Sequence, residues 1–226
     1  MAAEDDRPPN MEHRLKYKPK RLPHWDFGDV AQTITYRLAD SVSQSEYDKI
    51  QVEANNVLPE QRDRYVRTCV EKFIHENRYG SCCLNNPHAA KIVIDAWYFY
   101  AGDWYDLYEW VVMGNHVHVL IRQYEGHRLG DIVGSWKSYT SKKISFLLNL
   151  PQPIWREGYW DRMIRDEGHF EKAKQYILNN PQKSGYNNWP YISGGLASPP
   201  TTKLSGGLAS PPTTKITLCQ ELKHEP

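Results

Sequence analysis

The chain of 226 residues is poor in cysteine, has no long apolar run and carries almost no net charge. Its four cysteines, Cys69, Cys82, Cys83 and Cys219, show no paired CxxC spacing, which argues against a zinc knuckle or a disulfide framework. No stretch approaches the roughly 20 apolar residues that span a bilayer, and the first thirty residues lack the core of a signal peptide. These absences predict a cytoplasmic protein that does not associate with membranes.

The formal net charge of +1 excludes a uniformly polyanion-binding protein, but the charge is unevenly distributed. Five basic residues fall between Arg14 and Arg21, in a run typical either of a solvated tail or of an arm that grips phosphates. The 8 tryptophans and 15 tyrosines indicate a folded, aromatic-rich protein rather than a disordered one. At this length we expect one sizeable core.

Both ends of the chain have compositions that disfavour a packed core. Residues 1–22 are predicted to form a flexible leader, acidic at first and then basic. The sequence SGGLASPPTTK occurs at Ser193–Lys203 and again at Ser205–Lys215, and its Gly, Ser, Thr and Pro content predicts a disordered tail over 191–226. The folded domain is therefore expected over 23–190.

Hydrophobic periodicity predicts an α+β arrangement within that domain. Alternation of apolar and polar residues begins a strand near Val30, and helical spacing follows a proline at Pro59 and again at Pro87. The predicted elements are a strand from Val30, helices at 59–78 and from Pro87, strands Trp104–Met113 and His116–Gln123, a helix Leu129–Leu148, an extended stretch Trp155–Ile164 and a helix from Asp166 to about Asn179.

The His-Val-His sequence lies in the predicted strand His116–Gln123. Because successive side chains of a strand point to opposite faces, His116 and His118 share one face and Val117 lies on the other. Two imidazoles at this spacing can converge on one metal ion. The alternative, that the histidines are satisfied core residues, stays open on this pattern alone, since H-x-H is short.

The last predicted helix places Tyr176 and Asn180 four residues apart, on one face. A phenol has a pKa of about 10, so it attacks phosphorus only where a nearby cation favours the phenolate. Beside a His-x-His metal site, Tyr176 could act as such a nucleophile and Asn180 could supply an oxygen ligand suited to Mg²⁺ or Mn²⁺. Simple packing of Tyr176 is the alternative, and Pro181 disfavours helical geometry at Asn180.

A mixture of basic and aromatic residues on the predicted helix 129–148 and after it suits contacts with DNA phosphates and bases. For the tryptophan among them a core position is equally compatible with the sequence. The DNA-binding candidates are Lys137, Lys142, Lys143, Trp155, Arg156, Arg162 and Arg165.

Several strings together resemble the REP-associated tyrosine transposases, a branch of the single-tyrosine HUH endonucleases with a transposase IS200-like domain. They are LPHWD (22–26), ITYRLADS (34–41), EWVVMGNHVHVLI (109–121), WKSYTSKK (136–143), IWREGYWDRMIRDEGHF (154–170) and YILNNPQKSG (176–185). The resemblance implies a ferredoxin-like or RRM-like α+β fold with a central antiparallel sheet. It also implies that His116, His118 and Asn180 bind a divalent metal and that Tyr176 is the catalytic tyrosine.

By this resemblance the protein is expected to cut single-stranded DNA beside hairpin-forming repeats through a 5′-phosphotyrosine link, and to act as a monomer or homodimer in the cytoplasm, associated with the nucleoid. Two alternatives stay open. One is a catalytically silent DNA-binding domain, and the other is a metal hydrolase that uses water as its nucleophile.

Overall fold

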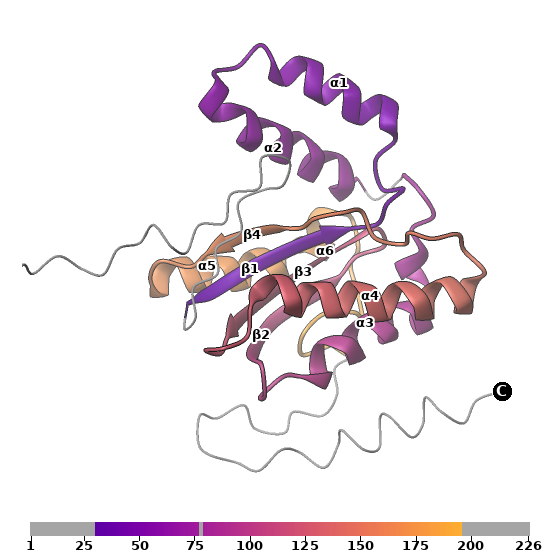
Figure 1. The fold of residues 1–226 in the computed structure, drawn as a ribbon, viewed down its shortest axis with the longest axis vertical. Helices are drawn as coiled ribbons and strands as arrows, with labels where there is room; N and C mark the ends of the chain where they lie inside the picture. Colours follow the sequence, from indigo (N-terminus) through magenta and orange to yellow (C-terminus); the bar gives the residue numbers. More distant parts are fainter. Residues whose placement is uncertain (1–29, 77–78, 196–226) are drawn as a thin grey trace, which may run out of the picture.

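The computed structural model describes residues 30–76 and 79–195, and these form an α+β fold around one sheet (Figure 1). The strands are β1 (Ala31–Arg37), β2 (Tyr105–Val112), β3 (His116–Gln123) and β4 (Trp160–Met163). The helices are α1 (Gln44–Ala54), α2 (Arg62–His75), α3 (Pro87–Phe99), α4 (Leu129–Leu148), α5 (Glu167–Leu178) and α6 (Asn180–Lys183), with 3-10 turns η2 (Pro59–Gln61) and η3 (Cys83–Asn85).

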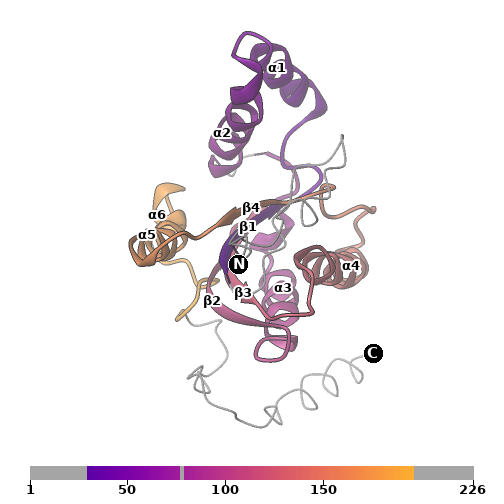
Figure 2. The same ribbon diagram turned by 60° about the vertical axis from the view of Figure 1, so that its left-hand side comes forward.

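The four strands pair antiparallel in the order β2-β3-β1-β4. Because β3 lies between β1 and β2, and β1 lies between β3 and β4, each helical crossover skips one strand, which is the ferredoxin-like topology. Figure 2 shows α3 and α4 on one side of the sheet and α5 with α6 on the other. The predicted fold class is therefore confirmed.

The face of the sheet under α3 and α4 carries the largest core cluster. Ile34 and Tyr36 of β1 and Val117 and Val119 of β3 alternate onto this face and are at most 2% exposed. The indoles and phenols in this core are paired with one another: Trp97 Nε1 donates to the Tyr36 hydroxyl at 3.0 Å, and Trp136 Nε1 to the Tyr105 hydroxyl at 2.9 Å. Because these polar groups are hydrogen-bonded to one another, their burial costs little free energy.

The opposite face is covered by α5 and bordered by the helical hairpin α1–α2. Ala173 and Ile177 of α5 are buried against Val111, Met113 and Leu120 of the sheet. The hairpin has a separate small cluster formed by Val42, Ile50, Val70 and Ile74. It rises beside β1 and β4, and α2 ends near the sheet (Figure 1).

Most of the predicted elements occur within a residue or two of their expected bounds, and helix 129–148 matches α4 at both ends. The helix predicted at 59–78 is a 3-10 turn followed by α2, which ends at His75. The stretch Trp155–Ile164 contributes only the four residues of β4, while Trp155 makes an isolated bridge to Leu38. Helix α1 was not predicted, because only Ile50 and Ala54 of its residues are buried.

The domain continues past its predicted boundary at residue 190. Val112 N–H donates to the Tyr191 carbonyl at 2.9 Å, and Ser193 N–H donates to the Trp110 carbonyl at 3.0 Å. Residues 191–193 therefore run along the outer edge of β2 instead of starting the predicted disordered tail. The leader 1–22 and the duplicated repeats beyond residue 195 lie outside the described residues. Within the described part of the chain, no helix is long and apolar enough to cross a membrane.

Candidate active site

The His-Val-His strand presents both imidazoles to the face covered by α5. His116 is 0% and His118 is 2% exposed. Their Nδ1 atoms are each in a hydrogen bond at 2.7 Å, His116 with Asn115 Oδ1 and His118 with Thr35 Oγ1 on β1. Because the Asn115 amide oxygen only accepts, His116 Nδ1 carries the proton and Nε2 presents its lone pair. The neighbouring side chains thus orient the rings for binding through Nε2.

Helix α5 brings Tyr176 to these imidazoles. Asp166 caps the helix by accepting from the backbone N–H of His169, and the apolar stripe formed by Phe170, Ala173 and Ile177 packs on the sheet. On the adjoining side of the helix the Tyr176 ring lies 5.5 Å from the His118 ring, measured between centroids. The structure therefore brings together the two elements that the sequence separates by nearly sixty residues.

A third histidine, His75 at the end of α2, joins the cluster and was not predicted from the sequence. Its ring centroid is 5.3 Å from that of His116 and 5.9 Å from that of His118, and its Nε2 lies 3.2 Å from the Tyr176 hydroxyl. One possible ligand atom from each of the three histidines lies within 4.8 Å of the others. No spacing rule links position 75 to the H-x-H strand, so only the fold reveals the contact.

Four buried side-chain atoms in this cluster have no hydrogen-bond partner among the described residues. They are His75 Nδ1, His116 Nε2, His118 Nε2 and Asn180 Oδ1. Buried polar atoms in native proteins are normally paired, so a group of unpaired side-chain nitrogens and an oxygen is typical of a site that can bind a cation. The set of imidazole nitrogens and one amide oxygen fits a divalent metal ion.

Asn180 lies just beyond α5, at the first position of α6, and is fully buried. Its Nδ2 donates to the Tyr176 carbonyl at 2.9 Å, which leaves Oδ1 as the free acceptor. The Asn180 side chain is thus held in place by the turn that follows α5. Its role as a metal ligand remains a prediction.

Burial sets the protonation of the cluster. Desolvation lowers the pKa of His118 to about 3 and that of His116 well below its usual value, so both rings stay neutral and able to bind a cation. Burial, together with Glu71, raises the pKa of Tyr176 to about 12, against the opposing effects of Asn180 and Arg67. The phenol is therefore not activated by these side chains alone.

Charged side chains surround the phenol. Lys183 Nζ lies 4.5 Å from the centre of the Tyr176 ring. On α2, Arg67 Nε, two turns before His75, pairs with Oε1 of Glu71, one turn before His75, at 2.8 Å. Lys183 and Arg67, which influence the environment of Tyr176, were not among the predicted DNA-binding residues.

Among the predicted DNA contacts, Trp155 has a structural role instead, and Lys137 is hydrogen-bonded within the protein while its predicted DNA contact stays a prediction. Trp155 is 4% exposed, donates from Nε1 to Thr140 Oγ1 at 2.8 Å and packs edge-on against Tyr36. Its predicted stacking on bases is wrong, because a ring enclosed in the core cannot reach them. Lys137 Nζ donates to the carbonyls of Arg156 and Gly158 at 2.6 and 2.7 Å, and burial lowers its pKa to about 8.

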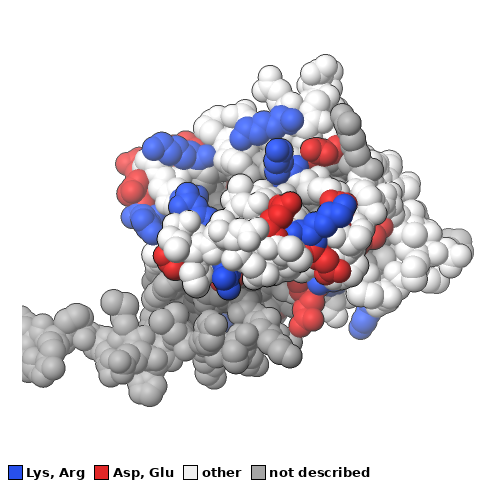
Figure 3. All heavy atoms as spheres, turned by 90° about the horizontal axis from the view of Figure 1, so that it is seen from above, with Lys and Arg blue, Asp and Glu red and all other residues white. Residues whose placement is uncertain are grey.

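The remaining candidates, Lys142, Lys143, Arg156, Arg162 and Arg165, stay predictions. Arg162 and Arg165 are exposed on and after β4, and Arg156 is exposed with its guanidinium 5.6 Å from the Tyr47 ring. Figure 3, which views the molecule from the side of α1, shows basic and acidic side chains interspersed rather than one basic stripe.

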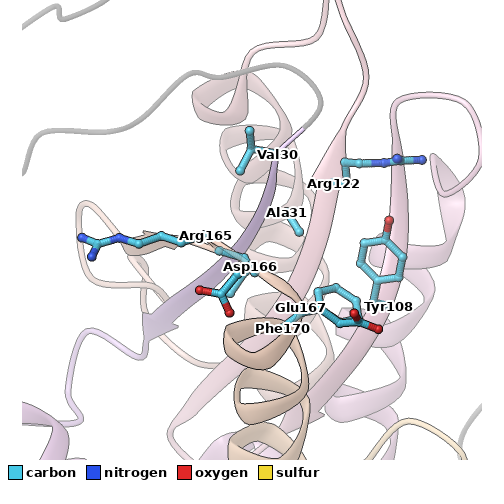
Figure 4. A pocket seen from close by; sticks show the side chains of 9 residues that line it. Val30, Ala31, Tyr108, Arg122, Arg165, Asp166, Glu167 and Phe170 are labelled. Atoms are coloured by element: carbon cyan, nitrogen blue, oxygen red, sulfur yellow. The ribbon is translucent and has the colours of Figure 1, made fainter.

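A separate hollow of about 390 Å³ lies at the other end of α5 (Figure 4). Its lining includes Tyr108, Arg122, Arg165, Asp166 and Glu167. It contains none of the clustered histidines and not Tyr176. The hollow is therefore distinct from the candidate active site.

Comparison with known proteins confirms the resemblance predicted from the sequence motifs. Residues 98–180 match the family described as Transposase IS200 like, a segment that includes His116, His118, Tyr176 and Asn180. The chain is similar to the REP-associated tyrosine transposase of Escherichia coli K12, with 26% identity over 91 residues, or 38% of this chain. It spans about half (53%) of the length of that curated relative.

Among solved structures, the chain is similar to a REP-associated tyrosine transposase bound to a REP hairpin. The two share 17% sequence identity with a TM-score of 0.46, over 77% of this chain and 82% of that one.

Proposed function

From this likeness to IS200-like transposases, we propose that the chain is a metal-dependent endonuclease and transposase that cuts single-stranded DNA with Tyr176. The observation that carries the proposal is the contact of the Tyr176 hydroxyl with the imidazole cluster, 3.2 Å from His75 Nε2. A phenol with a pKa raised to about 12 needs a cation before it can attack a phosphate. The three histidines beside it can hold one.

In the proposed reaction His116, His118 and Asn180 would hold a divalent cation. The cation would polarise the phosphate and stabilise the phenolate. The Tyr176 oxygen forms a bond to phosphorus while the bond from phosphorus to the 3′ oxygen breaks. The phenol loses its proton and the leaving oxygen gains one, so the products are a 5′-phosphotyrosine and a free 3′-hydroxyl.

The reverse reaction would rejoin DNA without a nucleotide cofactor. A 3′-hydroxyl attacks the phosphotyrosine, the new phosphodiester forms, and Tyr176 recovers its proton. Because one phosphoester replaces another in each direction, the bond energy is conserved. The name of the E. coli relative associates it with REP. We propose hairpin-forming repeats as the substrate class and expect the protein to act as a monomer or homodimer.

The proposal is tested with labelled single-stranded DNA that carries a REP-type hairpin, incubated with Mn²⁺ and run on a denaturing gel. We expect a DNA–protein adduct that disappears with EDTA and in Tyr176→Phe. Tyr139→Phe, on the exposed side of α4, is the matched control and should form the adduct as the unaltered protein does.

Cleavage without an adduct, unchanged in Tyr176→Phe, would contradict the covalent mechanism and favour a metal hydrolase that uses water. Hairpin binding without any cleavage, across several hairpins and with Mn²⁺ present, would favour a silent DNA-binding domain.

A further inference from the structure

The three histidines share one arrangement of hydrogen bonds. In each ring one nitrogen contacts a side-chain oxygen and the other has no partner among the described residues. The paired atoms are His116 Nδ1 with Asn115, His118 Nδ1 with Thr35, and His75 Nε2 with Tyr176. The unpaired atoms are His116 Nε2, His118 Nε2 and His75 Nδ1. An imidazole bound to a metal characteristically uses its second nitrogen for such an orienting hydrogen bond.

The spacing of the rings also suits one ion. Metal–nitrogen bonds of about 2.1 Å place the centroids of imidazoles on a common ion roughly 4.6 to 5.6 Å apart, for ligand angles between those of an octahedral and a trigonal site. The observed centroid distances are 4.9 Å between His116 and His118, 5.3 Å between His75 and His116, and 5.9 Å between His75 and His118. Two of these distances fall within the expected range and the distance between His75 and His118 is slightly longer, so the His75 ring lies close to the position of a third ligand.

We propose that His75 is a third imidazole ligand of the metal ion, in addition to the pair on β3 and to Asn180. This inference rests on the proposed function for the presence of a metal, but it concerns a residue outside the matched segment 98–180. The helical hairpin α1–α2 would therefore complete the metal site rather than only border it.

Other groups near the ring do not compete for this role. Glu71, one turn before His75, is engaged in its ion pair with Arg67. His75 can bind the ion through one nitrogen and keep the Tyr176 hydroxyl on the other, so the ligand would also orient the nucleophile. A histidine bound through Nδ1 carries its proton on Nε2, which makes it a donor to the tyrosine oxygen.

A third imidazole changes which ions the site prefers. Two imidazoles with oxygen ligands still accept hard cations such as Mg²⁺, whereas three imidazoles and one amide oxygen favour Zn²⁺ and other later transition ions. The expectation of Mg²⁺ or Mn²⁺ as equivalent cofactors is sharpened accordingly: the ion should be a transition metal.

The test measures ion binding to the metal-free full chain by calorimetry, with Zn²⁺ and Mg²⁺ as separate probes. His75→Gln should weaken Zn²⁺ binding more than about 100-fold, beyond the roughly 10- to 100-fold loss typical of removing an outer partner. Tyr176→Phe should leave Zn²⁺ affinity within about threefold, because it removes only the oxygen at the far nitrogen of His75. His88→Gln, an exposed histidine of α3, should change nothing.

Pulsed electron paramagnetic resonance of the unaltered protein with bound Cu²⁺ supplies a second measurement that needs no variant. Three coordinated imidazoles would support the proposal, and two would overturn it. Zn²⁺ binding unchanged in His75→Gln, but lost in His116→Gln, would also overturn it while leaving the proposed nuclease intact. Failure of the unaltered protein to bind any ion would instead contradict the metal-dependent function itself.

Discussion

The two faces of the sheet bury polar groups in opposite ways. Under α3 and α4, the indoles of Trp97, Trp136 and Trp155 each donate to a hydroxyl oxygen, so this face is apolar and internally paired. Under α5, His116 and His118 are as deeply buried but each keeps an unpaired nitrogen. The comparison indicates that the first face supplies stability, and it supports the proposal that the second face binds an ion.

The largest expected effect concerns the face covered by α5, where it separates a role of the histidines in activity from a role in stability. The double change His116→Gln and His118→Gln should reduce adduct formation by at least about 10³-fold, since removing even one anion-stabilising donor costs roughly 10²- to 10³-fold. Urea unfolding in EDTA should show little loss of stability. A large loss of stability together with activity would mean that the histidines are structural.

For the face under α3 and α4 we expect the opposite result, a loss of stability with little change in ion binding. Trp136→Ala leaves a cavity and removes the donor to the Tyr105 hydroxyl, so it should lower the free energy of unfolding by about 3–5 kcal/mol. The urea midpoint measures this loss. Zn²⁺ affinity at a temperature where the variant is still folded should stay within a few-fold of the unaltered protein.

The buried histidines also predict how stability depends on pH. Their folded pKa values lie below the unfolded value of about 6.5, so the unfolded chain binds protons that the folded chain does not. The contribution of these histidines to the free energy of unfolding is therefore fully present above pH 6.5 and is lost as the pH falls towards 3. For His118 alone the loss at pH 5 is about 2 kcal/mol.

Urea titrations at pH 7.5 and pH 5, both in EDTA, measure this difference. The double glutamine variant should show a flatter pH dependence, because it lacks the two groups that titrate. If the free energy of unfolding changes equally with pH in both proteins, titrating groups other than these histidines set the pH dependence.

The smallest expected effect is on stability, and it distinguishes Lys137 from Lys142, two lysines of α4. Lys137 donates to the carbonyls of Arg156 and Gly158, so Lys137→Met should cost about 1–3 kcal/mol of stability by removing both hydrogen bonds. Lys142→Met, at an exposed position of the same helix, should change stability by less than about 0.5 kcal/mol. Weaker single-stranded DNA binding in Lys142→Met alone would support its predicted contact with phosphates.

Local patterns in the sequence predict much of the fold and part of the candidate site. The two-residue period places His116 and His118 on one face, and the spacing of Phe170, Ala173 and Ile177 sets the side of α5 that packs on the sheet. Helix α1 has little buried surface, although Ser43, which accepts from the Glu46 N–H, is a capping signal that could have revealed it.

Contacts between distant segments were beyond the reach of such patterns. His75 joins the site only because the hairpin α1–α2 folds over the sheet, and Trp155 lies in the core only because Thr140 and Tyr36 enclose it. The residues next to His75 and Trp155 in the sequence show no periodic pattern that would identify their neighbours in the fold. A mixture of aromatic and basic residues therefore suggested a DNA surface where part of it builds the core.

Residues 191–193 have a further consequence for the sheet as a whole. By occupying the hydrogen-bonding groups of Trp110 and Val112, they protect one outer strand from pairing with another chain. Among the described residues, the other outer strand, β4, is only four residues long and presents Arg162 to solvent. Short, charged outer strands resist sheet-to-sheet aggregation, so both edges of this sheet are protected against pairing with another chain.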